Sequence, residues 1–100
     1  MPSFYCKLNA PRASFLQDMS ADEAQVMKDH AVYWREFVAK GNVLAFGLVA
    51  DPAGVFGVGL VEFDDDDQAR TFTNNDPTIR SGRGFSFDVL PMPMGIVSPR

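Results

Sequence analysis

The stretch from Ser20 to Phe63 reads SADEAQVMKDHAVYWREFVAKGNVLAFGLVADPAGVFGVGLVEF and contains one helix pattern followed by two strand patterns. At its start, Ser20 can accept a hydrogen bond from the backbone amide of Glu23 while the Glu23 side chain reaches back to the amide of Ser20. At the end of the helix pattern, Gly41 suits the left-handed conformation that often follows a helix C-terminus. We therefore predict a helix over residues 21–40.

Apolar and aromatic side chains recur along this segment at steps of three and four residues, which is the spacing of one helix face. His30, the only histidine of the chain, lies near the middle of that face. The residues of the predicted face are Val26, Met27, His30, Tyr33, Trp34, Phe37 and Val38.

Residues 43–50 and 55–63 are rich in strand-forming side chains and are joined by Asp51-Pro52-Ala53-Gly54, a sequence typical of a type I turn. The two segments should pair as an antiparallel hairpin. Gly57 and Gly59 point to the same side of the second strand, and this bare strip predicts close approach by a packed helix or by a ligand.

The flanking segments complete the pattern. Residues 3–8 predict a first strand, and residues 64–67, four consecutive aspartates, predict the start of a second helix that Asn74-Asn75 can close. Asp76-Pro77 predicts a further helical turn with Asp76 as its N-cap, and residues 85–90 predict the last strand. The order is βαββαβ, so we expect an α+β, ferredoxin-like domain with a four-stranded antiparallel sheet and two helices on one face.

The uncovered face of this sheet would carry apolar side chains, and the segment Pro91-Met92-Pro93-Met94-Gly95-Ile96-Val97 is too apolar for a solvated terminus. We expect a symmetric homodimer that buries the open face, with the tail of residues 91–100 at its interface. The 100 residues form one domain, 1–100, because a second core would not fit.

The composition limits the classes of binding partner and the cellular compartment that we expect. A net charge of -4 with scattered Lys and Arg residues argues against nucleic acid, and no apolar run is long enough to cross a bilayer. The single cysteine, Cys6, excludes an internal disulfide and fits a reducing compartment, so we expect a cytoplasmic protein. On a first strand Cys6 should be a buried small side chain rather than a nucleophile.

Metal and nucleotide sites are not indicated. The four aspartates lack the spacing, glycine and closing glutamate of a calcium-binding EF-hand loop, so they suit a solvated helix start. One histidine and one cysteine are too few for a zinc site, and no glycine-rich phosphate loop is present. We expect no metal and no cofactor.

The sequence resembles the YCII-related, or YciI-like, family in an ordered set of short motifs. These motifs are His30-Ala31-Val32-Tyr33-Trp34, Gly41, the run from Phe46 to Gly54, Asn75-Asp76-Pro77, Gly82 and Pro91-Met92. The resemblance implies a ferredoxin-like subunit of a dimeric α/β barrel, and an active site that pairs His30 with Asp76. It also implies a small-molecule ligand, since a dehydrochlorinase acting on a chlorinated polyhydroxybenzene belongs to the family.

One departure concerns the second strand. Family members usually carry Gly-Pro where this chain has Gly47-Leu48, so the pocket wall and the substrate are expected to differ. Gly47, Gly57 and Gly59 are therefore candidate substrate-binding positions, together with Tyr33 and Trp34 one turn from the histidine.

Each candidate also has a purely structural explanation. His30 on an apolar face can be a packed histidine, Asp76 can serve only as a helix cap, and Tyr33, Trp34 and Phe37 can simply form the core. For the pair itself, a carboxylate bonded to one imidazole nitrogen makes the other nitrogen a better base.

Two functions remain open at this stage. The first is a small cofactor-independent lyase or isomerase in which His30 and Asp76 act as a general acid/base pair on a phenolic or enolisable cyclic substrate. The second is a non-catalytic ligand-binding or accessory dimerisation module in which His30 is structural.

Overall fold

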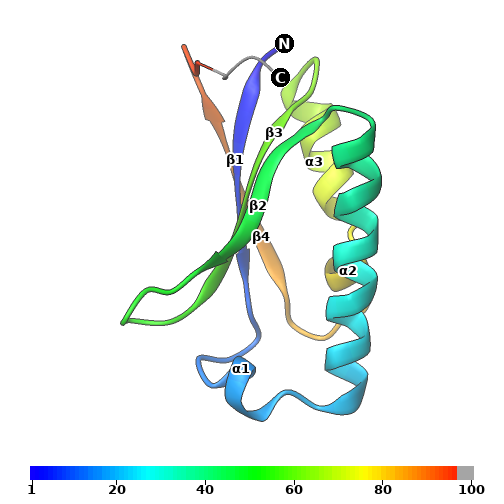
Figure 1. Cartoon of the computed structure of the whole chain (residues 1–100), viewed down its shortest axis with the longest axis vertical. Helices are drawn as coiled ribbons and strands as arrows, with labels where there is room; N and C mark the ends of the chain where they lie inside the picture. Colours follow the sequence, from blue (N-terminus) through cyan, green and yellow to red (C-terminus); the bar gives the residue numbers. More distant parts are fainter. Residues whose placement is uncertain (97–100) are drawn as a thin grey trace.

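A computed structural model describes residues 1–96, which form one four-stranded antiparallel sheet with helices on one face (Figure 1). The strands lie in the order β2-β3-β1-β4, and all three neighbouring pairs are antiparallel. The predicted α+β, ferredoxin-like fold is confirmed. The elements along the chain are β1 (Ser3–Asn9), α1 (Phe15–Asp18), α2 (Ala21–Ala39), β2 (Val43–Val49), β3 (Phe56–Glu62), α3 (Asp66–Asn74), α4 (Pro77–Arg80) and β4 (Ser86–Met92).

Helix α2 begins and ends as its sequence predicts. The Ser20 hydroxyl accepts from the Glu23 amide and the Glu23 carboxylate accepts from the Ser20 amide, which completes the capping box. After the helix, Gly41 adopts a φ of +87°, a conformation that glycine takes without steric cost. The buried face is narrower than predicted, because Val38 is 45% exposed.

The predicted hairpin joins β2 to β3, and Gly54 donates its amide to the Asp51 carbonyl across the turn. The close approach predicted at Gly59 is made by a helix: a Cβ there would lie 2.2 Å from the ring of Trp34. Gly57 meets the Leu8 side chain from β1, where a Cβ would lie 3.2 Å from the Leu8 Cβ.

The second half of the chain follows the predicted order, with small differences. Asp65 caps α3 by accepting from the Gln68 amide, and Asn75 ends the helix. The last strand is longer than the predicted 85–90: it continues through Pro91 and Met92, which the sequence pattern had placed in the tail. They belong to β4 because they pair with Phe4 and Ser3 of β1.

The short helix α1 was not predicted. Pro11 and a single turn of four residues give too little apolar periodicity to separate a helix from a loop. In the structure, Phe15 is buried and packs edge-on against Phe85 at the start of β4. This contact anchors α1 to the start of β4, and Figure 1 shows α1 beside the N-terminal end of α2.

The core lies between the sheet and the helices. Phe4, Cys6 and Val61 from the strands meet Trp34 and Phe72 from the helices, and all five are buried. The predicted burial of Cys6 is confirmed, and this burial raises the pKa of its thiol to about 12.

The opposite sheet face has no helix over it in the described residues, and it carries an apolar patch beside polar residues such as Lys7 and Asp88. On it, Tyr5 of β1 lies between Leu60 of β3 and Leu90 of β4. Leu90 is 56% exposed, and Met94 and Ile96, just after β4, are almost fully exposed. The rest of the predicted interface tail, residues 97–100, lies outside the described residues.

Within residues 1–96, no helix has both the length and the apolar character to span a bilayer.

Candidate functional site

Asp76 is fully buried, with no exposed surface, between the end of α3 and the start of α4. As the N-cap of α4, its Oδ1 accepts from the Thr78 amide at 2.8 Å and from the Thr78 hydroxyl at 2.7 Å. Asp76 therefore caps a helix, as the sequence predicts, with only one of its two oxygens.

The second oxygen of Asp76 is bonded from α2. His30 places Nδ1 at 2.8 Å from Oδ2, and the indole N–H of Trp34 donates to the same oxygen at 2.5 Å. His30 and Trp34 are four residues apart and so lie on one face of the helix. His30 and Asp76 are 46 positions apart in the sequence and meet because α2 and α4 pack together.

This hydrogen-bond pattern favours one form of the imidazole. The Trp34 indole and the Thr78 amide can only donate, so each Asp76 oxygen accepts at least one hydrogen bond, as the oxygens of an ionised carboxylate do. Beside a carboxylate, His30 donates from Nδ1. In the neutral imidazole, Nε2 is then the nitrogen with a free lone pair.

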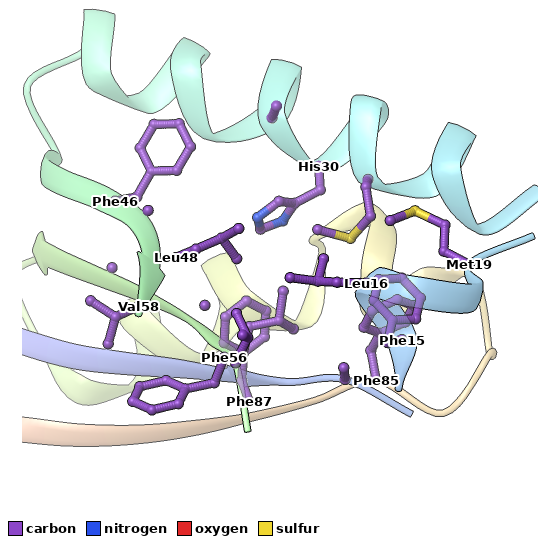
Figure 2. Close-up of a pocket in the computed structure, with 18 of the residues that line it drawn as sticks. Phe15, Leu16, Met19, His30, Phe46, Leu48, Phe56, Val58, Phe85 and Phe87 are labelled. Carbon is purple, nitrogen blue, oxygen red and sulfur yellow. The ribbon is translucent and has the colours of Figure 1, made fainter. Parts of the chain in front are cut away.

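His30 borders a cavity of about 340 Å³, which is within the size range of small-molecule sites. Its side chain is 13% exposed, and Figure 2 shows the ring directed from α2 into the cavity toward Leu16 and Leu48. The walls come from α1 and the residues just before it, from α2, from the β2–β3 hairpin and from the start of β4.

The cavity is predominantly apolar and aromatic. The labelled side chains that surround it in Figure 2 include Phe15, Phe46, Phe56, Phe85 and Phe87. Among the lining residues of the described chain, the polar side chains are His30, Arg12 and Gln17. A ring-shaped apolar ligand would therefore meet one side chain that can exchange a proton near neutral pH, the imidazole.

Most of the predicted site residues come together here. Trp34, Gly47, Gly57 and Gly59 line the same cavity as His30, and Asp76 lies behind the imidazole. Leu48, at the position of the family departure, also lines it and is 63% exposed.

Tyr33 is not part of the lining. Its hydroxyl donates to the Phe72 carbonyl at 2.7 Å, and its ring stacks on the Phe72 ring. Burial, followed by the negative charges of Asp76 and Glu36, raises the pKa of Tyr33 to about 12. These contacts give Tyr33 a packing role.

The sequence reasoning missed the wall formed by Arg12, Phe15, Leu16 and Met19. A usable signal was present, because Phe15 and Leu16 are adjacent apolar residues in a segment for which no helix or strand was predicted. Their role as a cavity wall depends on where the chain folds back, which local sequence does not encode.

Arg12 fastens this wall to α2. Its guanidinium donates from Nη1 and Nη2 to the Glu23 carboxylate, both at 2.8 Å, and from Nε to Asp18 at 2.6 Å. Arg12, helped by the Ser20 amide, lowers the pKa of Glu23 to about 2. The pKa of Asp18 is also lowered, first by the Ser14 hydroxyl and then by Arg12.

Within residues 1–96, no group of three or more His, Cys, Asp or Glu side chains is arranged to hold a metal ion.

Comparison with known proteins places the chain. In the solved structures, a 5-chloro-2-hydroxyhydroquinone dehydrochlorinase of Burkholderia phenoliruptrix, in complex with 2,5-dihydroxybenzoquinone, has the same fold with a TM-score of 0.64. The similarity covers 92% of this chain and 95% of that chain, at 17% sequence identity. No curated protein matches the sequence significantly. Residues 3–93 match the YCII-related domain, and the chain therefore belongs to the YCII-related family.

Proposed function

We propose that this protein is a small cofactor-independent enzyme of the lyase or isomerase type, in which His30 is the general acid/base and Asp76 orients it. The observation that carries the proposal is the bond from His30 Nδ1 to the buried Asp76 carboxylate, with the ring directed into an apolar cavity. A substrate hydroxyl or acidic C–H group beside Nε2 would lose its proton to the imidazole.

The chemistry proposed is proton removal from a small phenolic or enolisable cyclic compound. In a lyase reaction, the electron pair left by the proton expels a leaving group such as chloride. In an isomerase reaction, the imidazolium returns the proton to another atom of the same ring system. Asp76 stabilises the imidazolium in both cases, because its carboxylate remains bonded to Nδ1.

The test is turnover of a panel of phenolic and enolisable rings, which includes the chlorinated trihydroxybenzene for which the structural neighbour is named. Any compound that the wild type converts should react at least about 100-fold more slowly with His30→Ala. Asp76→Asn should also lower turnover. Undiminished turnover by His30→Ala would rule out the proposed role of the imidazole.

The imidazole itself supplies a second readout. Because His30 is the only histidine, its two ¹⁵N signals are unambiguous. The neutral ring should carry its proton on Nδ1 in the wild type, and Asp76→Asn should shift the population toward the form protonated on Nε2. A wild-type ring protonated on Nε2 would contradict the proposed orientation by Asp76.

The alternative is a ligand-binding or accessory module without catalysis. Its motivation is that, in the described lining, only His30 can exchange a proton near neutral pH, while Met94 and Ile96 present further apolar surface. In that case ligands bind but none is converted, and His30→Gln leaves ligand affinity near wild type. Conversion of a bound ligand would exclude this alternative.

We also propose a homodimer formed through the apolar sheet face that carries Tyr5, Leu60 and Leu90. An exposed face of this kind is typical of an interface. The net charge of -4 continues to argue against a nucleic-acid partner, and the single thiol of Cys6 supports our expectation of a cytoplasmic location.

A further inference from the structure

We propose that the cavity beside His30 selects uncharged rings with a single hydroxyl or enolisable carbonyl, and discriminates against polyhydroxylated rings and against anionic rings. The inference rests on the function proposed above and names the substrate class of that same site. It follows from which polar groups the cavity offers and which of them are already bonded.

The first step concerns hydrogen-bonding capacity. Of the three polar side chains in the described lining, Gln17 is exposed to solvent and Arg12 is bonded to carboxylates. His30 is the polar side chain that Figure 2 shows directed into the cavity, where it can bond a ligand hydroxyl. Further hydroxyls would lie against aromatic walls such as Phe46 and Phe87, where each loses water without gaining a partner.

The second step concerns charge. Arg12 is the cationic side chain of the lining, and its guanidinium is shared between Asp18 and Glu23. Both carboxyl groups have lowered pKa values, so both are ionised at neutral pH. Asp18 and Glu23 lie behind Arg12, outside the lining, and together they more than balance its positive charge. The paired guanidinium therefore offers no uncompensated positive charge to a ligand carboxylate.

The structural neighbour is a useful contrast. That protein is in complex with 2,5-dihydroxybenzoquinone, a ring with four oxygen substituents. For this chain, with its apolar walls, we expect such a ring to bind more weakly than one with a single oxygen.

The test uses matched pairs of ligands. Phloroglucinol carries three hydroxyls, and in the corresponding dimethylphenol methyl groups of similar size replace two of them. Para-hydroxybenzoate is likewise compared with its uncharged methyl ester. Binding is followed by the fluorescence of Trp34, the only tryptophan, which lines the cavity, and by the signals of the single histidine.

The uncharged, less hydroxylated member of each pair should bind at least about tenfold more tightly. Leu48→Gln places an amide at the exposed edge of the cavity. This variant should reduce the ratio of the affinities for the dimethylphenol and for phloroglucinol. Its control is Val32→Gln on α2. Val32 is 55% exposed and lies outside the lining, so this variant should leave the affinity ratio of the same ligand pair unchanged. Asp18→Asn removes one of the two anions and should reduce the ratio of the affinities for the methyl ester and for para-hydroxybenzoate.

Equal or tighter binding of phloroglucinol or of para-hydroxybenzoate would overturn the inference, and so would the absence of binding by every member of both pairs. This failure is distinct from failure of the proposed function. A polyhydroxylated ring that binds as tightly as its monohydroxylated counterpart and is converted by way of His30 would keep the function and refute the selectivity. A monohydroxylated ring that binds selectively, while His30→Ala leaves turnover unchanged, would do the reverse.

Discussion

At the scale of single residues, Asp76 is where the structural and functional explanations meet. One carboxylate oxygen caps α4 through Thr78, and the other binds His30 and Trp34. The cap and the histidine partner are therefore the same residue, because a carboxylate has enough lone pairs for both roles.

Trp34 shares the Asp76 oxygen with His30, so a substitution there tests the network without touching the imidazole. Trp34→Phe keeps an aromatic ring against Gly59 but removes the N–H donor to a buried carboxylate. We expect a loss of about 1–3 kcal/mol in the free energy of unfolding, measured in urea. We also expect the His30 ¹⁵N signals to move.

Phe46→Leu is a matched control for Trp34→Phe, since Phe46 packs on Trp34 but makes no bond to Asp76. Phe46→Leu can lose as much stability as Trp34→Phe, but its His30 signals should stay close to those of the wild type. Unmoved His30 signals in Trp34→Phe would show that the indole does not help to position the dyad.

At the scale of elements, α1 becomes a wall of the site because two contacts hold it. Phe15 packs on Phe85, and Arg12 ties the segment before α1 to Glu23 in the first turn of α2. Glu23 consequently closes the capping box and anchors the cavity wall at the same time.

The ion pair of Glu23 and Arg12 should make stability depend on pH in acid. Arg12 and the Ser20 amide lower the Glu23 pKa from 4.5 to about 2, so the folded state is favoured above pH 4.5 and loses that contribution as the pH falls toward 2. Chemical denaturation across this range should show a steeper fall for wild type than for Glu23→Gln, which keeps a capping side chain but does not titrate. If wild type and Glu23→Gln lost stability equally as the pH falls, the pH dependence would not come from the Glu23 carboxylate.

The contact between α2 and β3 allows a pair of matched glycine substitutions. Gly59→Ala puts a Cβ 2.2 Å from the Trp34 ring and should cost about 1–3 kcal/mol or more in the free energy of unfolding. Gly47→Ala meets nothing within 4 Å and should stay within about 0.5 kcal/mol of wild type. If the two variants had similar thermal and urea unfolding midpoints, a clash with Trp34 could not be the cause of any loss of stability in Gly59→Ala.

At the scale of the whole molecule, the sheet separates a helix-covered face, which contains the site, from an apolar uncovered face. Figure 1 shows α2 and α3 on one side of the sheet, with α1 beyond the lower end of the strands. Tyr5, Leu60 and Leu90 on the other side have no packing partner comparable to the helix layer within the described residues.

The proposed dimer should be visible in sedimentation. At micromolar concentration we expect the wild type to sediment as a dimer and the double variant Leu60→Glu, Leu90→Glu as a folded monomer, because buried carboxylates would be unpaired. Val32→Glu, on the helix side, is the control and should remain dimeric. A monomeric wild type would refute the dimer.

The sequence alone was sufficient for the order of the elements other than α1, the capping box at Ser20 and Glu23, the hairpin turn and the cap at Asp76. These features depend on residues within a few positions of one another, so local hydrogen bonding and periodicity encode them. The family resemblance added the pairing of His30 with Asp76 as an expectation.

Only the tertiary structure decided the rest. The Trp34 bond to Asp76, the wall formed by Arg12 and Phe15, and the exclusion of Tyr33 from the cavity all join segments distant in sequence. The same holds for Gly59, whose bare surface is filled by Trp34 from α2. Such contacts arise when helices dock on the sheet, and a period of side chains along one element cannot specify which atoms of another element will meet it.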